Sequence, residues 1–78
     1  MTEIKMTDVT IHIDKETNAD NRTKVETALR ELNGVLSVNI TNEKNHLLMV
    51  EYNPEVTNST HILITVRELV GHAEMIGL

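Results

Sequence analysis

The sequence predicts an α+β sandwich, in which an antiparallel four-stranded sheet carries two helices on one face. Several short segments alternate apolar with polar residues, which is the spacing of half-buried strands. Two other segments repeat apolar residues every three or four positions, which is the spacing of amphipathic helices. The order of these segments along the 78 residues is βαββαβ. This order is the ferredoxin-like, or split βαβ, arrangement.

Strands are expected where aliphatic residues alternate with polar ones. A turn at residues 42–45 joins the second and third strands into a hairpin, which Pro54 ends because proline cannot continue a ladder. The expected strands cover residues 9–13, 35–41, 48–52 and 72–76. Their inward-facing residues are Val9, Ile11, Ile13, Val38, Ile40, Leu48, Val50 and Tyr52.

The first helix is expected to follow a polar loop. Thr23 and Glu26 fit a capping box at its start, although Asp20 or Asn21 would cap it one turn earlier. Gly34 stops the helix, since glycine favours the left-handed conformation needed there. The residues expected to face inward are Val25, Ala28, Leu29 and Leu32.

The second helix is expected to begin at one of three adjacent capping residues and to end at Gly71. The candidate caps are Asn58, Ser59 and Thr60, and the residues expected to face inward are Ile62, Leu63, Val66 and Leu69. This helix is rich in β-branched residues, so packing rather than helix propensity must stabilise it.

Length and composition indicate one small domain over residues 1–78, with residues 1–7 as a flexible tail or an extension of the first strand. Forty per cent of the residues are apolar and Tyr52 is the one aromatic residue, so the core is aliphatic. The chain has no cysteine, which excludes disulfides, thiolate metal sites and thiol nucleophiles.

Charge and hydropathy argue against two classes of partner. Twelve acidic and seven basic residues give a net charge of −5 with no basic cluster, which disfavours nucleic acid. The central strands also offer no exposed aromatic residue for stacking bases. No apolar run approaches the roughly 20 residues that cross a bilayer. We therefore expect no membrane partner and a cytoplasmic location.

Three stretches of the sequence carry a resemblance to a known family. Residues 9–13 read VTIHI, residues 25–35 read VETALRELNGV and residues 50–54 read VEYNP. They are similar to the V-T-I-x-I strand, the V-x-x-I-E-x-A-L-x-x-L-x-G-V helix and the V-x-Y-D-P turn of the heavy-metal-associated domain. That domain is the fold of copper chaperones and of the N-terminal modules of metal-pumping ATPases. The resemblance covers most of the chain, with one extra residue, Val70, before Gly71.

The resemblance implies a metal site in the loop before the first helix, and the sequence departs from the family there. The family binds Cu(I) through the two thiolates of G-M-T-C-x-x-C, because soft cations prefer sulfur. Aligned without a gap, Thr17 keeps the threonine of that motif, while Asn18 and Asn21 stand at the two cysteine positions. Amide oxygens are hard, neutral ligands, so we expect a degenerate motif that cannot carry Cu(I).

A weak site for another cation is the first alternative. The loop holds oxygen ligands suited to Ca²⁺ or Mg²⁺, although their spacing is not that of an EF-hand: Asp14, Glu16, Asn18, Asp20 and Asn21. In the simpler interpretation, Asp20 and Asn21 cap the helix and solvate the loop.

His72 is the strongest single candidate for a metal ligand. The resemblance places it beside the metal loop, at a position where the family has tyrosine, phenylalanine or lysine. With Asn18, Asn21 and Asp20 it makes a poor set of ligands, so it is either a weak ligand or a polar loop residue. The other histidines are spread over separate elements and do not form a metal-binding pair: His12, His46 and His61.

The open face of the sheet is the second candidate site. In the usual strand order of the family, 4-1-3-2, the outward residues Leu47 and Met49 neighbour His12 and Asn39. These residues mark either a partner or dimer patch or ordinary scattered apolar surface.

The preferred function is a non-catalytic binding or adaptor domain related to metal transport. Its expected partner is another protein domain, its expected state is a monomer or weak homodimer, and no cofactor is expected beyond a weakly bound metal ion. A second alternative is a small-molecule-sensing or dimerisation module of similar topology, whose glycine-rich loops are missing here. No Ser/His/Asp constellation or phosphate-binding glycine loop supports an enzyme.

Overall fold

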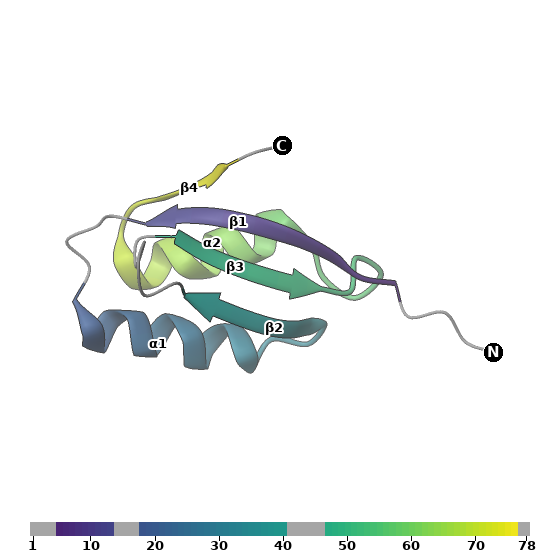
Figure 1. The fold of residues 1–78 in the computed structure, drawn as a ribbon, viewed down its shortest axis with the longest axis horizontal. Coiled ribbons are helices and arrows are strands. Elements are labelled where there is room, and N and C mark those ends of the chain that lie inside the picture. The colour runs from purple at the N-terminus through teal and green to yellow at the C-terminus, as the bar shows by residue number, and fades with distance from the viewer. Residues whose placement is uncertain (1–4, 14–17, 41–46, 77–78) are drawn as a thin grey trace.

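The computed structural model describes residues 5–13, 18–40 and 47–76, and it has the predicted order of strands and helices (Figure 1). The strands are β1 (Thr7–Ile13), β2 (Val35–Ile40), β3 (Leu47–Tyr52) and β4 (Ala73–Ile76). The helices are α1 (Ala19–Arg30) and α2 (Ser59–Val70). The predicted fold class is therefore confirmed.

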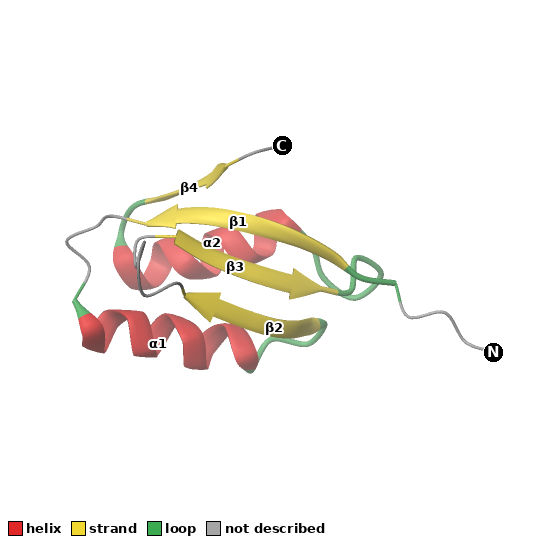
Figure 2. Cartoon of the chain, viewed as in Figure 1, coloured by secondary structure: helices red, strands yellow, loops and turns green. Residues whose placement is uncertain are grey.

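The four strands form one antiparallel sheet in the order β2-β3-β1-β4, which confirms the predicted strand order (Figure 2). The register places Ile11 of β1 opposite Leu48 of β3 and Met75 of β4. Alternate residues of each strand are buried under the two helices, which leaves the other face of the sheet open.

The core is aliphatic, as predicted, and it lies between the sheet and the helices. Its buried residues are Val9, Ile11, Ile13, Val25, Leu29, Val38, Leu48, Val50, Tyr52, Ile62, Leu63, Val66 and Ala73. The prediction that Leu69 faces inward is wrong, because Leu69 is 38% exposed and Val70 packs against the core instead. Val70 lies four residues after Val66, on the same face of the helix. Neither helix of the described residues is long and apolar enough to cross a membrane.

The starts of α1, β1, β3 and β4 differ from the sequence prediction. Helix α1 begins one turn before Thr23, so the predicted capping box does not form, and the Thr23 hydroxyl donates instead to the Ala19 carbonyl at 3.0 Å. Strand β4 begins at Ala73 rather than at His72. Strand β1 includes Thr7, the last residue of the predicted tail. Residues 1–4 and the predicted turn at residues 42–45 lie outside the described residues.

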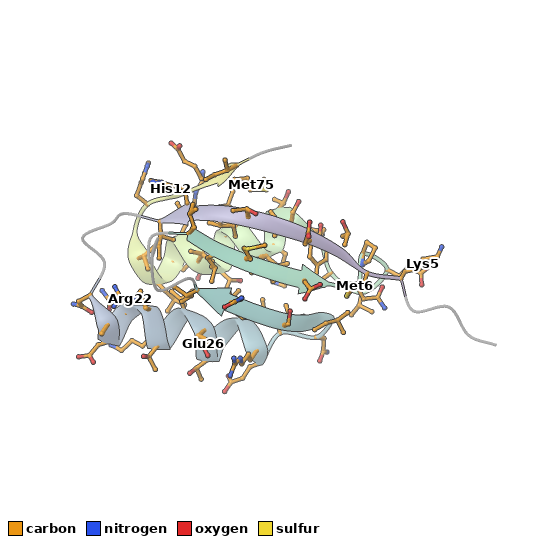
Figure 3. All side chains as sticks on the ribbon, in the orientation of Figure 1. Lys5, Met6, His12, Arg22, Glu26 and Met75 are labelled. Carbon is orange, nitrogen blue, oxygen red and sulfur yellow. The ribbon has the colours of Figure 1, made fainter. Side chains whose placement is uncertain are left out.

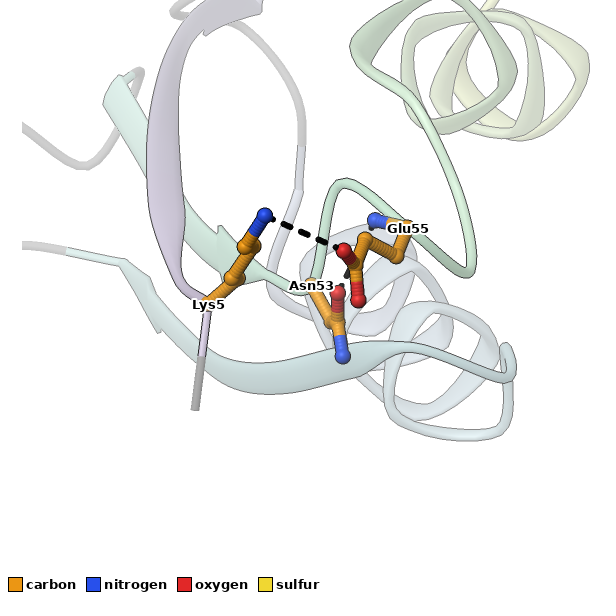
Figure 4. A network of polar contacts seen from close by, with 3 residues as sticks. All are labelled: Lys5, Asn53 and Glu55. Carbon is orange, nitrogen blue, oxygen red and sulfur yellow. Dashed lines mark hydrogen bonds and ion pairs between the residues drawn. The ribbon is translucent and has the colours of Figure 1, made fainter. Parts of the chain in front are cut away.

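A corner follows β3 at the end of the sheet opposite the start of α1 (Figure 1). Figure 4 shows its polar contacts. The Asn53 backbone N–H donates to the Gly34 carbonyl at 2.7 Å, which ties this corner to the turn after α1. The Asn53 side-chain oxygen accepts from the Glu55 N–H at 2.9 Å. Lys5 Nζ lies 3.3 Å from Glu55 Oε1, an exposed ion pair that contributes little to stability.

Candidate functional site

Asn18, one of the predicted metal ligands, caps helix α1. Its backbone is extended, with φ −77° and ψ 170°, and its carbonyl accepts the N–H of Arg22 at 3.0 Å. Its side-chain Oδ1 accepts the backbone N–H of Asn21 at 2.8 Å. Asn18 thus satisfies one of the N–H groups that a helix leaves without a partner at its start.

The other two candidates on this segment lie in the first turn of α1. Asp20 is exposed, and its carboxylate lies at the helix end that carries a partial positive charge, which stabilises the helix. Asn21 supplies its backbone N–H to the cap. The structure therefore brings Asn18 and Asn21 together through a hydrogen bond that belongs to the helix. Asp14 and Glu16 lie outside the described residues.

His72 lies in the turn between α2 and β4, directly after Gly71, which has a positive φ of 85°. In Figure 1 this turn and the start of α1 lie at the same end of the sheet. The imidazole is largely exposed, and its Nε2 lies 3.5 Å from Glu74 Oε1, which follows in β4. Within residues 5–13, 18–40 and 47–76, no group of three or more His, Asp or Glu side chains is placed to hold a metal ion.

The open face brings together the three residues that the sequence singled out as a partner surface. His12 lies at the end of β1 beside β4 (Figure 3). It is directly opposite Leu47, and Met49 lies between Thr10 and Asn39. Leu47 is partly exposed and Met49 is 41% exposed. We call His12, Leu47 and Met49 the open-face patch. Their predicted proximity is confirmed, and their role remains a prediction.

A hollow of about 410 Å³ adjoins the open-face patch at Met49. We call it the acidic hollow, and its lining residues are Asp8, Ser37, Val38, Asn39, Met49 and Glu51. Asp8 of β1 lies directly opposite Glu51 of β3. The Ser37 hydroxyl donates to Glu51 Oε1 at 2.6 Å and fixes that carboxylate.

Sequence reasoning missed the acidic hollow. Asp8 and Glu51 occupy outward positions of their strands, which the alternation of apolar residues already indicates. Their position opposite each other depends on the register between β1 and β3. This register pairs residue 8 with residue 51, which lie 43 positions apart in the sequence. Period-2 alternation sets the face of a residue but does not set its partner on a distant strand.

Comparison with known proteins gives likeness in structure alone. No family model matches the sequence, and no curated protein matches it. Among solved structures, a copper-binding domain from HMA7, a P-type ATPase, superposes with a TM-score of 0.76 at 21% identity, over 90% of this chain and 93% of that one. Oxidised MerP from Ralstonia metallidurans superposes with a TM-score of 0.73 at 17% identity, over 91% of this chain and 94% of that one.

A third neighbour, the CopZ metallochaperone, superposes with a TM-score of 0.67 at 14% identity, over 92% of this chain and all of that one. All three likenesses span nearly the whole of both chains. They establish that this chain has the fold of these small copper-binding and metallochaperone domains.

Proposed function

We propose that this chain is a non-catalytic protein-binding domain, related to heavy-metal transport domains, that does not carry Cu(I). Its fold is that of a copper-binding ATPase domain and of a metallochaperone. Its sequence has no cysteine, so it lacks the thiolates that soft cations prefer. Asn18 and Asn21 stand where the family motif has its two cysteines.

The hydrogen bond from the Asn21 N–H to Asn18 Oδ1, at 2.8 Å, is the observation that carries this proposal. The oxygen that a metal ion would need is already an acceptor in the helix cap. A cation at Asn18 would compete with that bond, and removing the cap costs about 1 kcal/mol. A neutral amide oxygen gains little from a cation in return, because water offers equivalent oxygen ligands.

Weak metal binding is the second candidate function. It is favoured by the position of His72, because the turn between α2 and β4 lies at the same end of the sheet as the start of α1 (Figure 1). Asn18, Asp20, Asn21 and His72 would then supply one imidazole and up to three oxygens. Strong sites have three or four good donors held in place, so affinity would be low.

An amide NMR titration with Cu(I), Zn²⁺, Ni²⁺ and Ca²⁺ separates the two functions. It follows the N–H signals of Asn18 to Thr23 and of His72. We expect no saturable, localised shift at micromolar cation. Saturable shifts confined to these residues would overturn the proposal in favour of the metal-binding function.

The matched control restores sulfur at both positions in one chain, Asn18→Cys with Asn21→Cys. If this chain is related to metal-transport domains, the double variant should bind Cu(I) under reducing conditions and the parent chain should not. Failure of the double variant to bind Cu(I) would contradict the relation to metal-transport domains. A serine pair at the same positions controls for the loss of the amides.

A further inference from the structure

We propose that the acidic hollow binds an arginine side chain presented by a partner protein. This inference rests on the proposed function, in that it names the chemistry by which the domain recognises its partner. It concerns the open face of the sheet, away from the start of α1, where metal binding is tested.

The two carboxylates of the acidic hollow form a like-charge pair. Asp8 and Glu51 are directly opposite each other on neighbouring antiparallel strands, where side chains are about 4.5–5.5 Å apart at Cβ. Like charges in this position destabilise a sheet. Among the described residues, neither carboxylate has a basic partner: Lys5 pairs with Glu55 and Arg30 pairs with Glu26. A cation placed between Asp8 and Glu51 would remove this repulsion.

Several features favour a guanidinium over an ammonium as that cation. The guanidinium group is a planar fork of five N–H donors that can serve two carboxylates at once, whereas an ammonium acts as a point charge. Ser37 already holds Glu51 by one oxygen at 2.6 Å, so that carboxylate is oriented before binding. The exposed side chain of Met49 supplies an apolar wall for the methylene stem of an arginine.

The position of the acidic hollow favours a protein as the source of the guanidinium. Met49 lines the acidic hollow and also belongs to the open-face patch, so the two surfaces are continuous. A partner that inserts an arginine here would also cover Leu47 and the exposed part of Met49, and apolar burial would add to the charge-assisted bonds. The net charge of −5 attracts a basic partner surface during encounter.

The test is an amide NMR titration of the whole chain with a blocked heptapeptide that carries one central arginine among alanines and serines. Two matched peptides carry citrulline or lysine at the same place. We expect saturable shifts at Asp8, Ser37 and Glu51 with the arginine peptide at about millimolar concentration, since one side chain supplies only part of an interface. The lysine peptide should bind several-fold more weakly, and the citrulline peptide should give no localised shift.

Two variants separate binding from folding. Glu51→Gln should weaken the arginine peptide at least fivefold and shift the denaturation midpoint upward, because it removes the like-charge repulsion. Asp8→Asn should do the same. Glu68→Gln, an exposed change of equal charge on α2, should leave peptide binding unchanged.

The arginine site is overturned if citrulline and arginine peptides give equal shifts, or if Glu51→Gln binds as well as the parent chain. Its failure is distinguishable from failure of the proposed function. If the acidic hollow does not bind and the cation titration at Asn18 to Thr23 is also flat, the arginine site is wrong and the domain docks through another surface. Saturable metal binding at Asn18 to Thr23 overturns the proposed function whatever the peptide does.

Discussion

The two helices begin in the same way at opposite ends of the sheet. Asn18 Oδ1 accepts the N–H of Asn21 at 2.8 Å at the start of α1, and Asn58 Oδ1 accepts the N–H of His61 at 2.8 Å at the start of α2 (Figure 1). Only the first of these positions is aligned with a metal motif in the proposed relation to heavy-metal transport domains. Because Asn58 has the same geometry without that coincidence, capping alone is sufficient to explain why asparagine stands at position 18.

The helices differ in how their first and last turns are built. Asp20 gives α1 an acidic residue in its first turn, and Thr60 occupies the matching position of α2. The C-cap of α2 is Gly71 itself, whereas the C-cap of α1 is Glu31 and a further turn leads from it to Gly34. The comparison therefore supplies matched pairs of positions at which the roles of caps, charges and glycines can be measured separately.

The largest expected effect is the loss of stability when alanine replaces one of the two glycines that follow the helices, and this loss should differ between them. Gly34 and Gly71 have φ values of 93° and 85°, so alanine at either position strains the backbone by about 1–3 kcal/mol. A Cβ at Gly34 would also lie 2.8 Å from Val56 Cβ, whereas a Cβ at Gly71 meets nothing within 4 Å. Overpacking of this kind costs about 1–3 kcal/mol more. Urea denaturation should show Gly34→Ala less stable than Gly71→Ala, and equal losses would mean that Val56 moves aside.

An intermediate effect is expected from the two caps. Asn18→Ala and Asn58→Ala should each lower the free energy of unfolding by about 1 kcal/mol, since each leaves one N–H of the first turn without its partner. Asn18→Asp and Asn58→Asp, which keep an acceptor oxygen, should lose little or nothing. Thermal denaturation of the four variants tests this equality. A loss at Asn18 that appears only when metal is present would indicate a ligand rather than a cap.

The smallest effect concerns the charge in the first turn. Asp20→Asn should lower stability by about 0.3–1 kcal/mol, and Thr60→Asp should raise it by a similar amount, because a carboxylate interacts favourably with the positive end of a helix. Both changes should shrink as salt is added. Denaturation midpoints at low and high ionic strength give the measurement. The two substitutions should change stability in opposite directions. A change in the same direction would contradict an interaction between the carboxylate and the helix end.

The fold was predictable from the sequence because one face of every element is buried. Alternation along the strands and three-to-four spacing along the helices identified the core and, with the family resemblance, the strand order. The inward assignment of Leu69 failed because the extra residue, Val70, takes the buried place at the end of α2. Helical spacing allows both residues near the core, and only packing against the sheet decides between them.

The candidate site was predictable in part. The residues of the open-face patch follow from alternation together with strand order. The sequence analysis placed the cap of α1 at Thr23, or at Asp20 or Asn21, and the structure places it at Asn18. All of these residue types satisfy the local rules for a cap, and the choice depends on where the chain leaves β1. The acidic hollow needs the register of β1 against β3, which no local pattern contains.

The two edges of the sheet restrict how copies of this chain can meet. Edge strand β2 is irregular, since the register shifts between Val35 and Ser37 and leaves Leu36 without a partner across the ladder. The other edge strand, β4, is only four residues long. Irregular and short edges hinder the stacking of strands from different molecules into growing fibres. A concentrated solution of this domain should therefore resist forming amyloid-like assemblies, and a partner would approach its faces rather than add a fifth strand.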